Sequence, residues 1–171
     1  ADSPFYQAMY KAQATGVLLS DAIARTPLEQ KFTIMGHSLG ARATYFTLLS
    51  LAQSKGHKNC LNRVHEVHFF GGAVGADEKE LVEMKKLNIH QINNYYSMND
   101  MVLKNLYQGV TAFTSKPIGR NKIKGHKNVK NHNVTTNVSG HQEYVINADD
   151  YLVITKFDSS MYKEEQSNLE D

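Results

Sequence analysis

The sequence predicts an α/β domain built around a mostly parallel β-sheet. Three observations point to it: short apolar runs alternate with helical patterns along the chain, the runs end in glycine, serine or aspartate, and no internal repeat interrupts them. This alternation is typical of a sheet covered by helices. The chain has 171 residues, 41% of them hydrophobic, which is the size of one globular domain. We assign residues 1–158 to this domain and residues 159–171 to a polar tail.

The first third of the chain predicts a helix, a strand and a second helix. Residues 4–25 carry apolar side chains at three- and four-residue spacings, with Ser3 as a cap and Pro4 in the first turn. A Thr-Pro pair follows and ends the helix. Residues 31–36 have the β-branched and aromatic composition of a buried strand. Residues 39–53 are apolar nearly all round, which indicates a buried helix.

The remaining elements repeat the alternation. Residues 63–75 predict a second strand that runs into glycines, and the next segment has the Glu and Lys spacing of a surface helix. The expected elements after residue 75 are a helix at 76–87, a strand at 92–100, a short helix at 101–108, a polar loop at 111–130, a strand at 133–138, and a helix from the turn at 139 to about residue 157.

Ser38 is the first candidate for chemistry. It lies in the stretch Gly36-His37-Ser38-Leu39-Gly40, between the first strand and a buried helix. A Gly-x-Ser-x-Gly stretch at a strand-to-helix turn is typical of a nucleophile elbow, in which the serine is strained and the glycines prevent backbone clashes. The alternative is a glycine turn with an inert serine.

A serine nucleophile needs a base and an orienting acid, and both candidates follow Ser38 in the chain. Asp100 closes the third predicted strand, and His141 comes directly after the fourth. The carboxyl ends of parallel strands meet at one edge of a sheet, so these side chains are expected to lie together. The order Ser, Asp, His is the order of the α/β-hydrolase triad. Asp77, after the second strand, is the reserve acid.

Other titratable residues have plainer interpretations. Asp149 and Asp150 are expected on a solvated helix face, His126 and His132 in or beside the polar loop, and His37 as a group that lines the elbow. His65 and His68 are three apart on a strand and face opposite sides, which argues against a metal pair. The sequence has no HExxH, CxxC or phosphate-loop motif, so we expect no metal and no cofactor. The single Cys60 excludes an internal disulfide.

The charge balance is nearly neutral. Lys and Arg number 19 against 17 Asp and Glu, a net charge of +2, so we expect no nucleic-acid partner. The exception is local, because residues 120–130 include no acidic residue. A solvated loop is the plainer interpretation of this stretch. The functional interpretation is contact of its cations with anionic lipid head groups at a membrane surface. These cations are Arg120, Lys122, Lys124, Lys127 and Lys130.

The sequence leaves the compartment undecided. No apolar run approaches the roughly 20 residues that span a bilayer, and the first residues lack the pattern of a signal peptide. We therefore expect a soluble chain. The sequence lacks an initiator Met and begins almost inside a helix, from which we expect a processed or excised piece of a longer protein.

Four stretches together resemble a known family. They are MGHSLGARATYFTLLSLAQ, VHEVHFFGGAVGAD, INNYYSMNDMVLKNLY and SGHQEY. They resemble the DUF726 family of α/β-hydrolases, relatives of the transmembrane and coiled-coil domain protein 4 group. The resemblance covers roughly residues 31–144. It implies Ser38 as nucleophile, Asp100 as acid and His141 as base, and a further likeness to bacterial lipase-type effectors implies a lipid ester as substrate.

One departure from the α/β-hydrolase pattern affects the expected chemistry. Only one helix and one strand precede Ser38, so the chain resembles the carboxyl-terminal half of that fold. Leu39 can supply one oxyanion N–H, but no HGGG-like loop precedes the elbow to supply a second. Three hypotheses follow: an esterase or lipase with an acyl-enzyme on Ser38, an acyltransferase with the same residues, or an interaction module that pairs with a missing segment or a partner chain.

Overall fold

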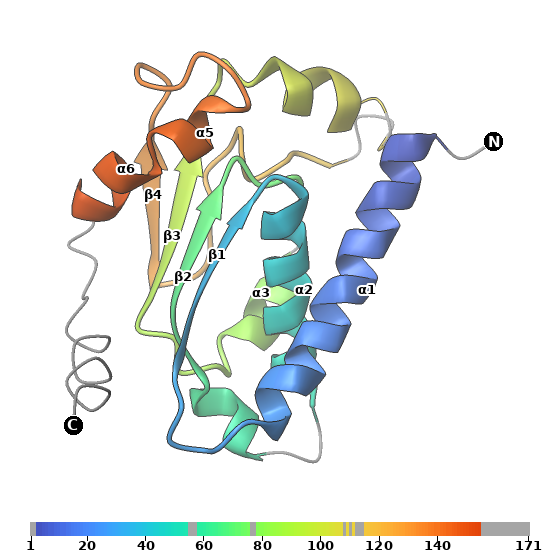
Figure 1. The fold of residues 1–171 in the computed structure, drawn as a ribbon, viewed down its shortest axis with the longest axis vertical. Coiled ribbons are helices and arrows are strands. Elements are labelled where there is room, and N and C mark those ends of the chain that lie inside the picture. The colour runs from blue at the N-terminus through green and yellow to red at the C-terminus, as the bar shows by residue number, and fades with distance from the viewer. Residues whose placement is uncertain are drawn as a thin grey trace, which may run out of the picture.

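The structure is a computed structural model and describes residues 3–54, 58–75, 78–107, 109, 111 and 115–154. Its elements follow one another as helices and strands around one sheet (Figure 1). They are α1 (Pro4–Arg25), β1 (Phe32–His37), α2 (Leu39–Gln53), η1 (Lys58–Asn62), β2 (Val64–Phe70), α3 (Glu78–Met84), β3 (Gln91–Tyr96), η2 (Leu103–Tyr107), β4 (Val129–Asn133), α5 (Glu143–Ile146) and α6 (Ala148–Ile154).

The four strands form a parallel sheet with the order β1-β2-β3-β4. Each strand pairs with the next one in the chain, so all four carboxyl ends lie at one edge of the sheet. Helices α1, α2 and α3 cover one face, and α5 and α6 lie on the other side near the carboxyl ends (Figure 1). The predicted α/β class is confirmed.

Helix α1 packs closely on α2, and this contact fixes the helix that follows Ser38. A Cβ on Gly16 would lie 2.3 Å from the carbonyl oxygen of Ala43, so only glycine allows the two backbones to approach this closely. The hydroxyl of Thr47 donates to the carbonyl of Gly16 at 3.1 Å. The Arg42 guanidinium donates from Nε to the carbonyl of Met9 at 2.9 Å.

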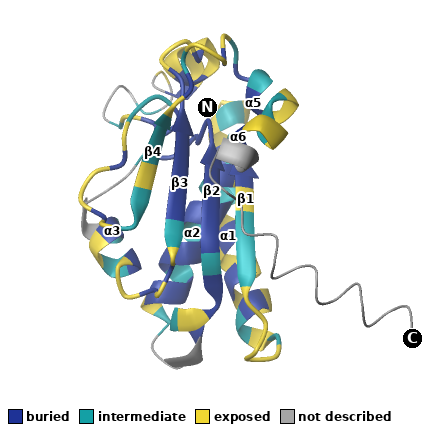
Figure 2. Cartoon of the chain, turned by 90° about the vertical axis from the view of Figure 1, so that its left-hand side faces the viewer, coloured by how far each residue is buried: buried dark blue, intermediate teal, exposed yellow. Residues whose placement is uncertain are grey.

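The core is divided between the two faces of the sheet. The larger cluster joins α2 and α3 to the sheet and includes Leu48, Val67 and Ile92, each at most 2% exposed. A smaller cluster on the other face contains Tyr95 and Tyr144. The central strands β2 and β3 are buried along nearly their whole length, whereas β1 and β4 are only partly covered (Figure 2).

The predictions for the first two helices are confirmed to the residue, at 4–25 and 39–53. The fourth strand was predicted wrongly at 133–138: β4 is Val129–Asn133, which begins in the last two residues of the predicted loop and overlaps the predicted strand only at residue 133. Its side chains are mostly polar and bond to neighbours, as Asn131 does to Ile123, so the strand lacks an apolar pattern. Residues 134–138 instead form a turn, in which the amide of Val138 donates to the carbonyl of Val134.

Other boundaries also differ from the sequence prediction, three of them near the carboxyl edge of the sheet. The third strand ends at Tyr96, and residues 97–100 form a turn. The short helix that follows becomes a π-helix at Leu103–Tyr107. The predicted last helix is two helices, because α5 ends at Ile146 and Asn147 separates it from α6.

Asp77 and the predicted tail at 159–171 lie outside the described residues. Within the part of the chain that the structure describes, no helix has the length and apolar character needed to cross a membrane.

Candidate active site

Ser38 occupies a strained turn between β1 and α2. Its φ is 55° and its ψ is −115°, and it is the one non-glycine residue with positive φ among the described residues. A conformation of this kind persists only where the surroundings impose it, and such residues concentrate at functional sites. Gly36 makes the turn possible, because a Cβ there would lie 2.6 Å from the backbone of Gly40 and Ala41.

Gly40 has a different role from the one that the sequence predicts. A Cβ on Gly40 would meet no atom within 4 Å outside its own helix backbone, so the expected backbone clash on this side of the serine is absent. Of the two glycines, only Gly36 is needed for the close approach of the strand end to the backbone at the start of α2.

The structure brings the three residues selected from the sequence into one hydrogen-bonded chain. His141 Nε2 lies 2.7 Å from Ser38 Oγ, and His141 Nδ1 lies 2.6 Å from Asp100 Oδ2. Asp100 is fully buried and His141 is 8% exposed. The residues come from the ends of β1 and β3 and from the turn before α5, all at the carboxyl edge of the sheet.

The hydrogen-bond pattern fixes the protonation of the imidazole. An ionised Asp100 carboxylate can only accept, so Nδ1 of His141 carries the proton and donates it to Asp100. In the neutral ring Nε2 is then free to accept, and the Ser38 hydroxyl donates to it. The arrangement can therefore remove a proton from the serine and hold the resulting imidazolium beside a carboxylate.

Asp100 is held from both sides. Its second oxygen, Oδ1, accepts the backbone N–H of Leu103 at 3.0 Å. The guanidinium of Arg120 donates to the backbone carbonyl of Asp100 at 2.6 Å. One carboxylate oxygen is thus committed to the backbone, and the other remains for His141.

The turn after β3 is bonded to the segment that leads into His141. The buried hydroxyl of Ser97 donates to the carbonyl of Val138 at 2.7 Å. The amide of Met98 donates to the hydroxyl of Thr135, and the side chain of Asn99 to its carbonyl, at 3.0 and 3.1 Å. These bonds fix the distance between Asp100 and His141 across 41 residues of chain. Sequence reasoning missed this role, because a serine or threonine near a turn has no distinguishing pattern.

His37 holds the backbone of the base. Its Nε2–H donates to the carbonyl of His141 at 2.9 Å, and the two rings lie 4.8 Å apart. Burial lowers the pKa of His37, so its ring is more readily neutral than a free imidazole. The predicted elbow-lining role fits this position.

Tyr144 packs beside the rings of His37 and His141. Its ring lies against Gly71, where a Cβ would approach to 2.6 Å, and its hydroxyl donates to the carbonyl of Gly119 at 3.1 Å. Burial raises the pKa of Tyr144, so the hydroxyl stays protonated as a donor. Gly119 is itself pressed against the backbone of Gly71 and Gly72, which brings the loop after residue 115 to the edge of the site.

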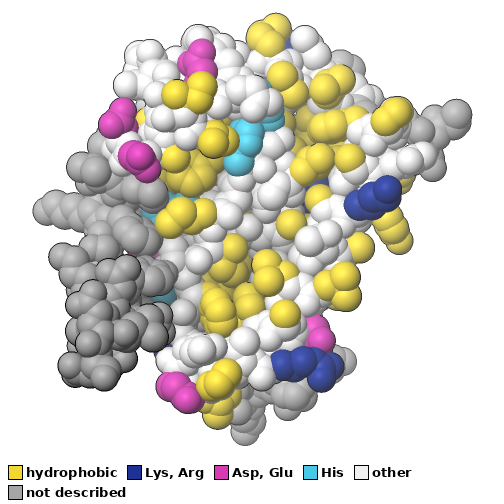
Figure 3. Space-filling model, in the orientation of Figure 1, with side chains coloured by type: hydrophobic (Ala, Val, Ile, Leu, Met, Phe, Trp, Pro, Cys, Tyr) yellow, Lys and Arg dark blue, Asp and Glu magenta, His cyan; other side chains and the backbone are white. Residues whose placement is uncertain are grey.

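Exposed apolar side chains surround the three residues. Histidine side chains reach the surface near the carboxyl end of the sheet, with hydrophobic side chains on both sides (Figure 3). Two groups with 39% to 77% exposure lie near the site in sequence, one within six residues of Asp100 and one four and five residues after His141. They are Met98, Met101, Val102 and Leu106, and Val145 and Ile146.

The cations of residues 120–130 do not form one patch. Arg120, Lys122 and Lys124 line a hollow with Tyr96 and Met98, next to the turn that carries Asp100. Lys127 lines a different hollow, with Leu87 and Asn88, near the amino ends of β3 and β4. Lys130 lies in β4, one residue before Asn131, so its side chain leaves the opposite face of the sheet.

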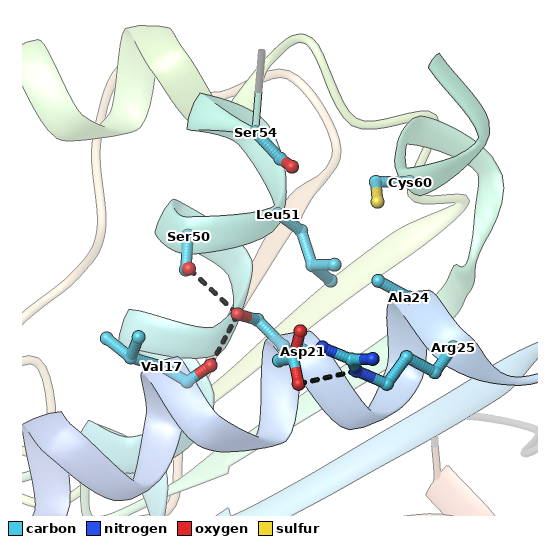
Figure 4. A pocket seen from close by; sticks show the side chains of 9 residues that line it. Val17, Asp21, Ala24, Arg25, Ser50, Leu51, Ser54 and Cys60 are labelled. Carbon is cyan, nitrogen blue, oxygen red and sulfur yellow. Dashed lines mark hydrogen bonds and ion pairs between the residues drawn. The ribbon is translucent and has the colours of Figure 1, made fainter. Parts of the chain in front are cut away.

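A separate cavity of about 360 Å³ lies between α1 and α2 at the opposite end of the sheet (Figure 4). Its polar side chains bond to one another: the hydroxyl of Ser20 contacts that of Ser50 at 2.8 Å, and Arg25 pairs with Asp21 at 2.7 Å. Cys60 faces it and is free, with 2% exposure.

A buried polar group lies on β2 and β3, away from Ser38. His68 Nδ1 lies 3.1 Å from the Tyr95 hydroxyl, and Glu66 accepts from the Asn93 amide at 3.0 Å. Burial lowers the pKa of His68 to about 4, so its ring is neutral at pH 7. In the described ranges no cluster of three His, Cys, Asp or Glu side chains has the arrangement of a metal site.

Three curated relatives match the chain at low identity. An uncharacterized membrane protein, C6F6.13c of Schizosaccharomyces pombe, is 28% identical over 84% of this chain and 18% of its own length. The "Probable lipase MIL1" of Saccharomyces cerevisiae is 28% identical over 84% and 13%. An uncharacterized membrane protein, F35D11.3 of Caenorhabditis elegans, is 26% identical over 84% and 23%. The chain thus spans less than a quarter of each, and no solved structure matches it.

The family comparison agrees with the resemblance noted in the sequence. Residues 1–158 match the family described as "Protein of unknown function (DUF726)". The match includes the elbow, the turn that carries Asp100 and the segment that carries His141. The chain therefore belongs to the DUF726 family.

Proposed function

We propose that the chain is a serine hydrolase that cleaves carboxylic esters through an acyl-enzyme on Ser38. The observation that carries the proposal is the continuous hydrogen-bonded chain from Ser38 through His141 to Asp100, at 2.7 and 2.6 Å. A strained serine at a strand-to-helix turn, a neutral imidazole accepting from it and a buried carboxylate behind the imidazole are the parts that nucleophilic acyl transfer needs.

The reaction proceeds in two steps. His141 Nε2 takes the proton of the Ser38 hydroxyl while Oγ attacks the ester carbonyl carbon, and the imidazolium then gives that proton to the departing alcohol. Water enters, gives a proton to Nε2 and attacks the acyl carbon, and the carboxylic acid leaves as Ser38 recovers its proton. Asp100 stays ionised throughout and stabilises the imidazolium. An alcohol in place of water would complete an acyl transfer with the same residues.

Leu39 is the proposed oxyanion donor. It is the first residue of α2, so its N–H has no acceptor in the preceding turn of its own helix. The positive end of the helix dipole adds to its effect on a developing negative charge. One donor of this kind contributes roughly 10² to 10³ in rate.

The apolar surroundings favour a lipid ester as the substrate. Exposed side chains such as Met101, Leu106 and Ile146 would contact acyl chains next to the serine. The printed name of the yeast relative, a probable lipase, supports the same class.

The experiment is covalent labelling with a fluorophosphonate probe, read by mass spectrometry. The expected result is one adduct on Ser38 that disappears in both Ser38→Ala and His141→Ala. Hydrolysis of p-nitrophenyl butyrate and of a long-chain ester by the same samples then tests the substrate class. A folded chain whose Ser38 reacts no faster than in His141→Ala contradicts the proposal.

A second candidate function is an interaction module. Strand β1 is an outer strand of the sheet, partly exposed along most of its length, and Met35 on it is 43% exposed. An open strand edge of this kind pairs readily with another strand. Under this alternative the chain binds a partner strand and its Ser38 does not react with the probe, so the labelling experiment separates the two functions.

A further inference from the structure

A hollow beside the proposed active site has the composition of a binding site for an anionic group. Its volume is about 480 Å³. The described lining includes four cationic side chains and no carboxylate: Lys116, Arg120, Lys122 and Lys124, together with Leu81, Tyr96, Met98, Ile118 and Asn121. The sequence analysis identified three of these cations and missed Lys116.

The sheet holds the backbone of the segment that carries Lys122 and Lys124. Asn131 on β4 binds both the backbone N–H and the carbonyl of Ile123, at 2.8 and 2.9 Å. Asn94 on β3, which is fully buried, donates to Asn131 and to the carbonyl of Asn121 at 3.1 and 3.0 Å. Ile123 is in the core, so the residues on either side of it, Lys122 and Lys124, are presented at the surface.

This arrangement keeps like charges near one another before any ligand arrives. Their mutual repulsion is relieved by an anion, and the backbone is already fixed, so binding requires little ordering. These bonds to the sheet give a structural role to the buried Asn94 of β3 and the half-buried Asn131 of β4. Their side chains bond to the backbone of residues 121 and 123, and apolar side chains at these strand positions could not make such bonds.

The buried part of the lining is apolar, and one cation of the hollow also contacts the turn that carries Asp100. Tyr96, Ile118 and Leu81 are buried, whereas Met98 is 55% exposed. Arg120 belongs both to the hollow and to the Asp100 turn, because it donates to the Asp100 carbonyl at 2.6 Å. The positive charge of the lining, its apolar contacts and its nearness to the proposed active site together favour an amphiphile with an anionic head.

We propose that this hollow binds the phosphate group of an anionic phospholipid and so selects phospholipid surfaces as the substrate form. The role in substrate selection rests on the proposed hydrolase function, whereas binding of the lipid head group does not. Each well-placed cation near an anionic surface contributes about fivefold to binding. Loss of Lys122 and Lys124 together therefore weakens binding by roughly 25-fold.

The experiment measures flotation of Ser38→Ala chain with two kinds of vesicle, phosphatidylcholine alone and phosphatidylcholine with about 30% phosphatidylglycerol. The expected result is binding to the second kind only, lost in Lys122→Gln/Lys124→Gln. The matched control is Lys127→Gln/Lys130→Gln, which removes the same charge at other places in the fold and retains binding. Equal loss in the two double variants, or no binding to anionic vesicles, overturns the proposal.

Inorganic phosphate distinguishes a lipid head group from a free anion. At equal ionic strength, millimolar phosphate is expected to release the chain from anionic vesicles more than chloride does, because phosphate competes for the hollow whereas chloride only screens charge. A phosphate-induced rise in melting temperature that Lys122→Gln/Lys124→Gln abolishes, in a chain that does not bind anionic vesicles, would assign the hollow to free phosphate instead. Since Ser38→Ala cannot react, failure of vesicle binding refutes the hollow, whereas failure of fluorophosphonate labelling in the unsubstituted chain refutes the hydrolase.

Discussion

Replacing Asp100 by asparagine tests the orientation of the base with the smallest change in shape. The carboxylate accepts two hydrogen bonds, from Leu103 N–H at 3.0 Å and from His141 Nδ1–H at 2.6 Å. An amide has only one oxygen. If that oxygen serves His141, the NH₂ group faces the fixed N–H of Leu103, and a buried donor without an acceptor costs about 1 to 3 kcal/mol.

The neutral imidazole of His141 can change its tautomer, whereas the backbone N–H of Leu103 is always a donor. In Asp100→Asn the oxygen therefore serves Leu103, the NH₂ group donates to Nδ1, and the proton of His141 moves to Nε2. Nε2 then faces Ser38 as a donor and no longer accepts the hydroxyl proton. The loss expected for a triad with the wrong tautomer is about 10⁴-fold in rate, or about 5.5 kcal/mol of barrier.

The assay is the second-order rate constant for fluorophosphonate labelling of Ser38, with circular dichroism melting to establish folding. Asp149→Asn is the matched control, because it is the same chemical change on an exposed residue of α6 and is expected to label at the unsubstituted rate. A folded Asp100→Asn chain that labels within tenfold of the unsubstituted rate would refute this account of how His141 is oriented.

Three further predictions concern the elbow, acid stability and the acid-bearing turn. Gly36→Ala is expected to lower the melting temperature strongly, because its Cβ would lie 2.6 Å from the backbone of Gly40 and Ala41. Gly40→Ala, which has open space at Cβ, is expected to leave the melting temperature unchanged or to raise it slightly. Equal changes in melting temperature for the two variants would contradict the elbow geometry. His68 has a pKa of about 4 in the folded chain and 6.5 in the unfolded chain, so unfolding takes up a proton between these pH values. The free energy of unfolding is therefore expected to fall by about 3 kcal/mol as the pH drops from 6.5 to 4. Urea titrations of the unsubstituted chain and of His68→Gln over this range measure the fall, and identical pH slopes in the two chains would exclude it. Ser97→Ala leaves the buried carbonyl of Val138 without its 2.7 Å donor, for an expected loss of about 1 to 3 kcal/mol and slower labelling of Ser38; unchanged labelling would mean that this bond does not position the base.

The sequence was most informative where local pattern decides structure. The all-round apolar composition of residues 39–53 and the capped, proline-terminated segment at 4–25 predict their helices to the residue. The elbow, too, is a local feature, since the sharp turn at Ser38 depends on Gly36 two residues before it. Order along the chain then selected Asp100 and His141, which the structure brings into contact.

Features that depend on distant contacts escaped the sequence. Strand β4 has the sequence Val-Lys-Asn-His-Asn, whose asparagines are poor strand formers alone and are stabilised here by bonds to β3 and to residues 121–123. The Arg120 contact with Asp100 and the His37 contact with His141 join residues far apart in the chain, with no spacing rule that predicts them. The division of the basic residues between hollows is likewise a property of the fold.

The most direct test of the central claim is to trap the acyl-enzyme. The chain is mixed with a p-nitrophenyl acyl ester, quenched in acid within the first turnover, and analysed by intact mass and peptide mapping. The account predicts an added acyl group on the peptide that contains Ser38, absent in Ser38→Ala and accumulating far more slowly in His141→Ala. A folded, unsubstituted chain that gains no acyl group, or gains it on a residue other than Ser38, would contradict the account.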